Sequence, residues 1–220
     1  MQYLIENFNT VWDRAVEHMA ISAISVAIAL CVSLPLGVLL SRPPLRPLAG
    51  AVLSVLGVIY TIPSFALFAL LVPVMEIGPR PAIFALVAYS LFVLVRNAFV
   101  AFTNLDPAVM EAARGMGMSP MQLLRRVELP LATPVLVAGL RVATLSTIGL
   151  ASIAAWIGAG GLGQLLKDGI NYPPRLYAGV IALGLMAVGA DLLFRLLERR
   201  FTRYLHPSIK GIEAVQPKEA

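Results

Sequence analysis

Residues that could perform catalysis are few in this chain and far apart. The two histidines, His18 and His206, lie near opposite ends, and Asp191 is the only carboxylate well inside a hydrophobic segment. A catalytic nucleophile needs a neighbouring base and a metal site needs several ligands at fixed spacing, so this distribution predicts neither. The phosphate-binding loop of ATPases has a glycine before its lysine, which none of the lysines has: Lys167, Lys210 and Lys218. We expect no catalytic residue, no metal and no cofactor in this chain, which disfavours an intramembrane enzyme.

A polar segment at residues 103–130 has instead the composition of a small folded unit. Asp106 can cap a helix that begins at Pro107, because the first helical position needs no N–H donor. That helix then meets Gly115 and Gly117, and glycine weakens or ends helices. The segment therefore predicts a short helix followed by a glycine elbow.

A second short helix is expected after the elbow. Ser119 and Gln122 have the spacing of a capping box, and Pro120 again takes the first helical position. We expect this helix to end before Pro130. Two helices joined at an angle form a compact knob that could dock into a soluble partner. By these physical arguments alone, an ordinary connecting loop between two spans is as good an interpretation as a docking knob.

The same segment carries a longer motif. It reads Glu-Ala-Ala at 111–113, glycine at 117 and Val-Glu-Leu-Pro at 127–130, with three and nine residues between these parts. This spacing resembles the EAA loop of ABC-importer permeases, with valine in place of the usual isoleucine. The resemblance implies a type I, methionine-permease-like fold, in which this loop is a coupling helix that inserts into an ATPase subunit. The coupling residues that it implies are Glu111, Ala112, Ala113, Gly117, Leu129 and Pro130.

A finer resemblance covers about half of the chain, residues 60–169. Four segments are similar to those of quaternary-amine (osmoprotectant) permeases: Tyr-Thr-Ile-Pro-Ser at 60–64, Arg-Asn at 96–97, Thr-Ile-Gly at 147–149 and Ile-Gly-Ala-Gly-Gly-Leu-Gly at 157–163. Tyr60 replaces the glutamine that begins the first of these segments in that family. The resemblance implies import of glycine betaine, choline or a related solute. Methionine and phosphonate permeases carry a similar glycine-rich segment, so import of such a solute is the alternative.

The partners of the chain follow from the same resemblance. It implies a second permease subunit, identical or related, and two copies of an ATPase subunit that bind ATP and Mg. It also implies a separate extracytoplasmic substrate-binding protein, because this chain has no room for a fused one. Membrane lipid is a further expected contact, and nucleic acid is not. A secondary transporter would need no ATPase, and the EAA spacing counts against that alternative.

The transport pathway must suit its solute. A quaternary ammonium group cannot donate a hydrogen bond and is held by aromatic faces through cation–π attraction. A proline inside a hydrophobic segment is expected to kink its helix, and such helices often line transport pathways. An arginine there could reach the membrane surface or form a contact between helices. The candidates for the pathway or its gate are Tyr60, Pro63, Phe65, Tyr89, Arg96, Asn97 and Trp156.

Hydrophobic segments must position all of these residues. The chain is 59% hydrophobic and 13% charged, with a mean hydropathy of +0.83, whereas soluble domains carry roughly 25% charged residues. A helix that crosses a bilayer needs about 20 apolar residues, and a helix satisfies its own backbone groups in lipid. We expect an all-α integral membrane protein with about five transmembrane helices, near residues 19–40, 48–74, 81–102, 131–157 and 176–197.

Basic residues are divided unequally between the two sets of connections. Eleven lysines and arginines lie in 41–47, in 103–130 or after 194, and four lie in the other set. The positive-inside rule then places the N-terminus outside, and the C-terminus and the 103–130 loop in the cytoplasm. The expected divisions are an extracytoplasmic segment 1–18, a permease domain 19–204 and a polar cytoplasmic tail 205–220, in a bacterial inner membrane.

Two charged residues in the last two hydrophobic segments need partners or an exit from the lipid. We expect Asp191 to pair with Arg195, one helical turn on. Arg141 is interpreted as a boundary residue, with the fourth span beginning after it.

Overall fold

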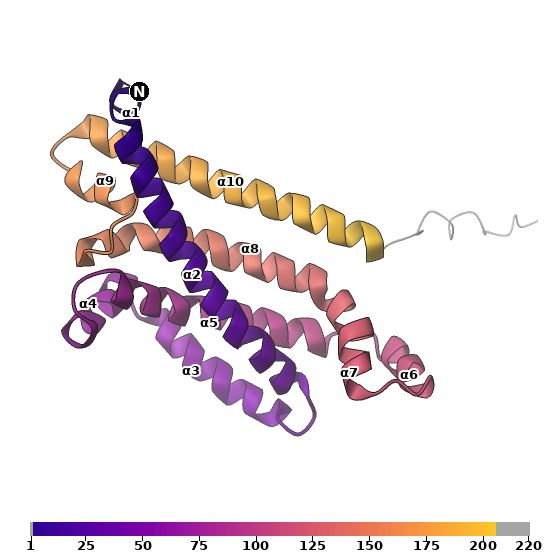
Figure 1. The fold of residues 1–220 in the computed structure, drawn as a ribbon. Coiled ribbons are helices and arrows are strands. Elements are labelled where there is room, and N and C mark those ends of the chain that lie inside the picture. The colour runs from indigo at the N-terminus through magenta and orange to yellow at the C-terminus, as the bar shows by residue number, and fades with distance from the viewer. Residues whose placement is uncertain (1, 206–220) are drawn as a thin grey trace, which may run out of the picture.

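The structure is a computed structural model that describes the backbone of residues 2–205 and the side chains of residues 3–200. The polar tail predicted from residue 205 onward therefore lies, beyond its first residue, outside the described residues. The described chain is helical, with no strand among its elements (Figure 1). In chain order the elements are α1 (Gln2–Glu6), α2 (Phe8–Ser41), η1 (Arg46–Leu48), α3 (Ala49–Thr61), α4 (Ser64–Met75), α5 (Pro79–Thr103), α6 (Pro107–Gly115), α7 (Pro120–Leu123), η2 (Leu124–Glu128), α8 (Leu129–Ile153), η3 (Ala154–Ile157), α9 (Gly163–Asp168) and α10 (Pro173–Leu205).

Four stretches of helix are long and apolar enough to cross a bilayer: Phe8–Ser41, Pro79–Thr103, Pro120–Ile157 and Pro173–Arg200. A fifth candidate is the pair α3 and α4, if both helices together make one crossing. The predicted all-helical membrane fold is confirmed, with four or five spans. The first of these helices already begins at Phe8, so it includes most of the segment that was expected to precede it.

The second hydrophobic segment is broken at Pro63, where only a kink was expected. The axes of the two helices that flank it meet at 93°. Ile62 adopts an extended conformation with φ −63° and ψ 129°, as residues before proline commonly do. The hydroxyl of Tyr89 on α5 donates a hydrogen bond to the carbonyl of Ile62. A side chain thus satisfies a backbone group that the break removes from the helix.

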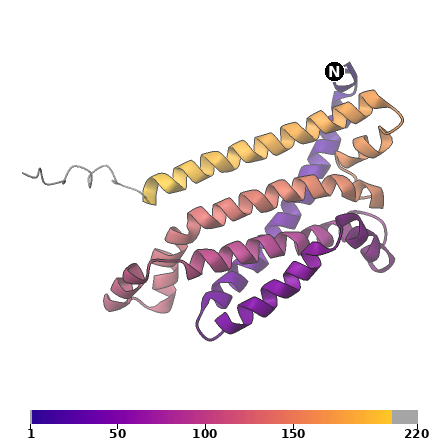
Figure 2. The ribbon, with the colours of Figure 1, turned by 180° about the vertical axis from the view of Figure 1, so that it is seen from behind.

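Helix α5 is the centre of the fold and packs against α2, α3, α4 and α8 (Figures 1 and 2). Small residues permit the close approach of these helices. Ala98 on α5 faces Gly37 of α2, and a Cβ atom at Gly37 would collide with it. Asn97 faces Gly139 of α8, where an added Cβ would lie 2.6 Å from the Cβ of Asn97. Gly37 and Gly139 therefore set the spacing of α2 and α8 around α5.

Helix α10 is attached to α8 by a group of charged residues. Asp191 accepts hydrogen bonds from Arg195 Nε at 2.7 Å, as predicted, and from Arg141 Nε at 2.6 Å. The Arg141 Nη1 atom also donates to Glu198 Oε2 at 3.3 Å. Helix α8 begins at Leu129 and holds Arg141, the residue interpreted as the boundary of the fourth span, in its interior. An inter-helix ion pair thus gives Arg141 partners on α10 that the sequence did not predict.

The two sets of connections lie at opposite ends of the molecule (Figure 1). The α2–α3 connection, the end of α10 and the loop between α5 and α8 gather at one end. We call this loop, which holds α6, α7 and η2, the α6–α7 unit. The N-terminus, the α4–α5 turn and α9 gather at the other end. These are the two groups into which the basic residues divided the sequence.

Candidate functional site

The loop between α5 and α8 folds into the predicted pair of short helices. The Asp106 carboxylate accepts a hydrogen bond from the N–H of Ala108 at 2.9 Å and so caps α6. Helix α6 ends at Gly115, and Gly117 follows in the left-handed region with φ +76°. No atom lies within 4 Å of a Cβ placed at Gly117, so the elbow needs glycine for its backbone conformation rather than for space.

The second arm begins as predicted and continues further. Ser119 and Gln122 form both hydrogen bonds of the capping box, at 2.9 and 3.4 Å. The helix was expected to end before Pro130, which is wrong. From α7 the chain passes through the π-helical stretch η2 directly into α8, and Pro130 lies in the first turn of α8. The proline, which has no N–H group, is accommodated at the junction where the helical hydrogen bonding changes from π to α.

The outer surface of this unit is exposed and carries unpaired apolar side chains. Glu111 and Ala112 are exposed, whereas Ala113 is buried at 2% exposure and packs inward. Met116 is 70% exposed and Met121 is 55% exposed. An exposed apolar surface of this kind is typical of a docking site for another protein.

The inner surface of the same unit holds an ion pair that the sequence did not predict, between buried Glu128 and half-buried Arg42. Glu128 is 1% exposed, and its carboxylate accepts hydrogen bonds from both terminal nitrogens of Arg42, one of them at 2.7 Å. The Arg42 guanidinium donates these hydrogen bonds to Glu128, and they raise the pKa of Arg42 above its ordinary value. The two residues are 86 positions apart, so no local pattern could have joined them.

Two of the predicted pathway residues come together beside the break at Pro63. The rings of Tyr60 and Tyr89 lie 5.8 Å apart in an edge-to-face arrangement. The ring of Phe92 lies 4.9 Å from that of Tyr60. Tyr89 is buried, but Tyr60 remains 39% exposed.

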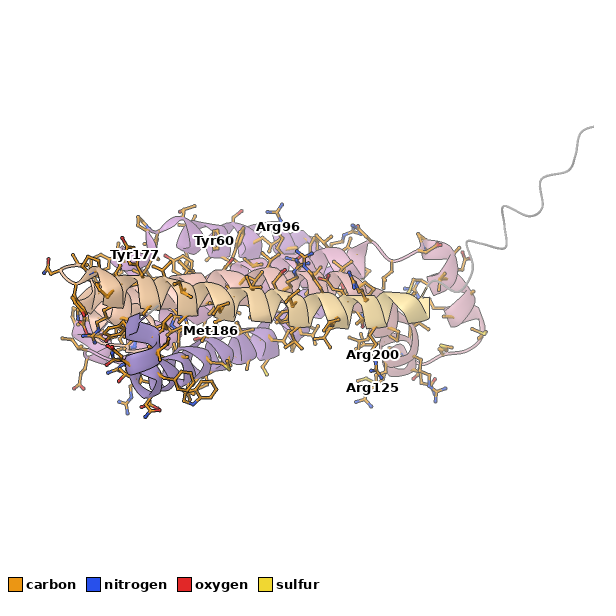
Figure 3. The ribbon with its side chains drawn as sticks, turned by 90° about the horizontal axis from the view of Figure 1, so that it is seen from above. Tyr60, Arg96, Arg125, Tyr177, Met186 and Arg200 are labelled. Atoms are coloured by element: carbon orange, nitrogen blue, oxygen red, sulfur yellow. The ribbon has the colours of Figure 1, made fainter. Side chains whose placement is uncertain are left out.

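The other pathway candidates lie apart from these rings. Phe65 and Trp156 are 52% and 42% exposed, and neither makes a ring contact with another described residue. Arg96 is exposed at the edge of the molecule that also holds Tyr60 (Figure 3), and it forms no ion pair within the described chain. Asn97 donates to the carbonyl of Val93 in its own helix at 2.8 Å. Figure 3 also shows Arg125 toward the end of the molecule that bears α6 and α7.

The glycine-rich segment after α8 rests against the start of α2. The N–H of Gly161 donates to Glu17 Oε2 at 3.0 Å, and the His18 ring bonds the carbonyl of Ile148 at 2.9 Å. Gly158, Gly160 and Gly161 all have φ between +72° and +81°. The buried histidine therefore joins two helices, and no group of three metal-binding side chains occurs in the described part of the chain.

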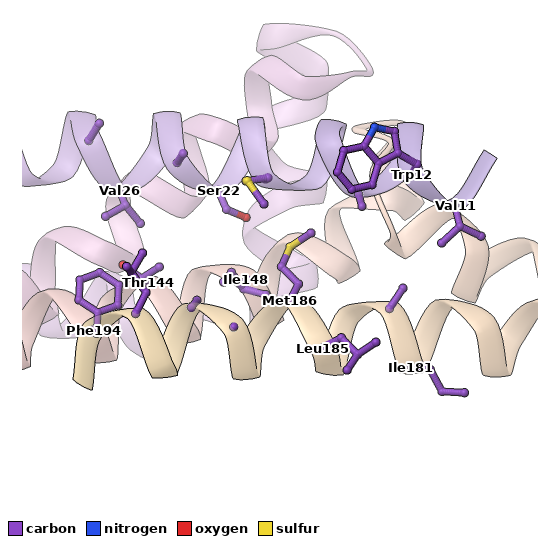
Figure 4. Close-up of a pocket in the computed structure, with 18 of the residues that line it drawn as sticks. Val11, Trp12, Ser22, Val26, Thr144, Ile148, Ile181, Leu185, Met186 and Phe194 are labelled. Carbon is purple, nitrogen blue, oxygen red and sulfur yellow. The ribbon is translucent and has the colours of Figure 1, made fainter. Parts of the chain in front are cut away.

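An apolar groove of about 1190 Å³ lies between α2, α8 and α10 (Figure 4). Ser22 from α2 and Met186 from α10 face one another across it. The Ser22 hydroxyl is buried and has no hydrogen-bond partner among the residues that the structure describes. None of the predicted pathway residues lines this groove, so it is separate from the aromatic group at Tyr60.

A family described as the binding-protein-dependent transport system inner membrane component matches residues 33–203. The chain belongs to this family. It is therefore an inner-membrane permease component of an ABC transport system, and its homologues are permease subunits rather than enzymes.

Two relatives cover nearly the whole chain. The choline transport system permease protein OpuBB of Bacillus subtilis is 35% identical over 204 residues, which are 92% of this chain and 93% of that protein. The osmoprotectant import permease protein OsmW of Salmonella typhimurium is 40% identical over 205 residues, 90% and 94% of the two chains. Among solved structures, the MetNI methionine ABC transporter in an inward-facing conformation matches with a TM-score of 0.79. It is 25% identical and covers 87% of this chain and 95% of that one.

Proposed function

We propose that this permease subunit imports quaternary-amine osmoprotectants such as choline or glycine betaine, driven by ATP hydrolysis in a separate subunit. The observation that carries the proposal is the identity of 35–40%, over at least nine-tenths of the chain, with permeases named for choline and osmoprotectant import. Two such permease subunits, two ATPase subunits and a separate binding protein would form the importer. ATP and Mg would be bound by the ATPase subunits.

The docking site for the ATPase would be the outer surface of the α6–α7 unit. Glu111 is placed to make a polar contact there, and Ala112 allows close approach because it is small. Exposed Met116 and Met121 add apolar area beside them. Ala113, Gly117, Leu129 and Pro130 would act indirectly, because they shape the unit and its junction with α8.

This placement also orients the chain. The connections that are rich in lysine and arginine gather at the α6–α7 end (Figure 1). The positive-inside rule then supports a cytoplasmic position for that end and for the C-terminus. The N-terminus and the glycine-rich segment would face the binding protein outside.

The exposed ring of Tyr60 is our candidate for contact with the quaternary ammonium group. Cation–π attraction contributes about 0.5–2 kcal/mol, depending on how far water is excluded. That magnitude suits a pathway, because a solute held more tightly would leave slowly. Phe65, Trp156, Pro63, Arg96 and Asn97 remain candidates for the pathway wall or the gate.

Uptake into proteoliposomes tests the proposal. The chain is reconstituted with its ATPase subunit and binding protein, and ATP-dependent uptake of radiolabelled choline and glycine betaine is measured. Glu111→Arg should abolish uptake, whereas a charge reversal at exposed Arg46, at the same end of the molecule but outside the α6–α7 unit, should not. Uptake that persists without any ATPase subunit would contradict the ABC mechanism.

Methionine import is the second candidate. The observation in its favour is the match to the MetNI permease, with a TM-score of 0.79. The identity to that chain is 25%, lower than to the osmoprotectant relatives. ATP-driven uptake of methionine in place of choline, in the same proteoliposomes, would select this candidate.

A further inference from the structure

The contact between Arg42 and Glu128 joins two parts of the chain that the proposed function would set in motion. Arg42 is the residue directly after α2, and Glu128 is the last residue of η2, directly before α8. The guanidinium meets the carboxylate through two parallel hydrogen bonds. A bidentate pair fixes direction as well as distance, because both planar groups must stay aligned.

An apolar cluster also links α2 to η2, by way of α5 and α8. Leu34 and Val38 of α2 and Leu124 of η2 pack against the buried residues Ala101 and Phe102 of α5 and Ala132 of α8. The end of α2 and the second arm of the α6–α7 unit are therefore joined directly by the Arg42–Glu128 pair and indirectly by this cluster. The first arm, α6, has only Ala113 buried.

We propose that the bidentate pair between Arg42 and Glu128 is a tether that makes α2 and the α6–α7 unit move as one rigid body, so that ATPase motion reaches the first span. The inference rests on the proposed function. Arg42 and Glu128 are positioning residues, since neither needs to touch the solute or ATP. Glu128 is 1% exposed and would be left without its partner by any slippage of the loop relative to α2.

A tether differs from a pair that only supports the fold, and two kinds of variant separate the roles. Arg42→Gln leaves the buried carboxylate of Glu128 without its partner, which weakens folding as well as the tether. Glu128→Gln also removes the tether, but it leaves alone only Arg42, whose side chain is 34% exposed. The double variant Arg42→Met/Glu128→Leu removes both charges, and apolar replacement of a buried pair commonly preserves stability. It keeps the fold but has no directional bonds. Arg46→Gln is the matched control, because Arg46 is an exposed cation in the same connection.

The first measurement is solute uptake per ATP hydrolysed in proteoliposomes that contain the ATPase subunit and the binding protein. We expect this ratio to fall about tenfold in both single variants and in the double variant, and to stay unchanged in Arg46→Gln. A double variant with the wild-type ratio would overturn the proposal, because the pair would then serve only the fold.

The second measurement needs no transport. Trypsin can cut after Arg125 or Arg126, which are exposed on η2. Release of the tether should speed this cleavage about tenfold in the double variant, since the arm would open more often. An unchanged cleavage rate would overturn the proposal. The proposal would also be overturned if the double variant is cleaved faster but keeps the wild-type ratio of uptake to ATP hydrolysis.

The two measurements also separate this inference from the function on which it rests. Wild-type protein that takes up no quaternary amine, with cleavage still faster in the double variant, would refute the proposed solute and leave the tether in place. If the wild-type protein takes up the quaternary amine, and the double variant matches it in uptake per ATP hydrolysed and in cleavage rate, only the tether is refuted.

Discussion

Replacement of Gly161 by alanine should destabilise the protein more than the same replacement at Gly117 or at Gly149. Gly161 has φ +72°, which L-residues rarely adopt, and it rests on α2. A Cβ added there would lie 3.0 Å from His18 Nδ1 and 3.1 Å from its Cα. The alanine would therefore meet both an unfavourable backbone conformation and a helix that cannot easily retreat.

The magnitude follows from these two effects. The left-handed conformation costs an L-residue about 1–2 kcal/mol. A methyl group forced into a packed contact typically costs about 1–3 kcal/mol more. The free energy of unfolding should thus fall by about 2–5 kcal/mol, which lowers the Tm of a chain of this size by about 4–20 °C.

Two control variants separate the effects. Gly117→Ala has the same backbone conformation, φ +76°, but nothing within 4 Å of the new Cβ, so it should show only the backbone cost. Gly149→Ala lies within α8 and also meets nothing within 4 Å, so it should not destabilise. Each Tm is read from the loss of the monodisperse peak in size-exclusion chromatography after heating in detergent. A Gly161→Ala variant as stable as Gly117→Ala would refute the contact with α2.

Three further predictions concern the ion pair between Arg141 and Asp191, the ring of Tyr60 and the exposed surface of the α6–α7 unit. Asp191→Asn should loosen α10 from α8, because Arg141 then keeps only its longer ion pair with Glu198, and should speed proteolysis of α10; Asp13→Asn, at an exposed site on α2, should not. Tyr60→Ala should reduce choline uptake about 2–30-fold, whereas Tyr60→Phe, which keeps the ring, should stay near wild type; equal loss in both would exclude a cation–π contact. Met116→Glu should weaken binding of the ATPase subunit in a pull-down without changing the Tm, and undiminished binding would place the docking surface elsewhere.

The α6–α7 unit was predictable from sequence because its signals are local. Asp106 and Ser119 cap helices through backbone groups two or three residues away, and Gly117 sets its own turn. Such contacts depend on neighbours in the chain and on little else. The prediction that the second helix ends before Pro130 was wrong, because the π-helical stretch before this residue continues the helix into α8.

The tertiary contacts of the site could not be read in this way. Arg42 and Glu128 are 86 positions apart, and Arg141 and Asp191 are 50 apart. Each of these residues also has an ordinary explanation as a surface charge near a membrane. Only the packing of α2, α8 and α10 decides which cation meets which anion. The same holds for Phe92, whose place beside Tyr60 depends on how α3 lies on α5.

The break at Pro63 has a consequence for how the chain enters the membrane. A helix rises 1.5 Å per residue, so the 13 residues of α3 extend only about 20 Å, short of the roughly 30 Å hydrocarbon layer. An insertion machinery that responds to hydrophobicity would see residues 48–74 as one continuous crossing. The bend exposes the carbonyl of Ile62, and its donor, the Tyr89 hydroxyl, is 27 residues further along the chain. The segment is therefore expected to insert straight and to bend only after α5 has arrived, so that the shape of this region is completed within the bilayer and not at the moment of insertion.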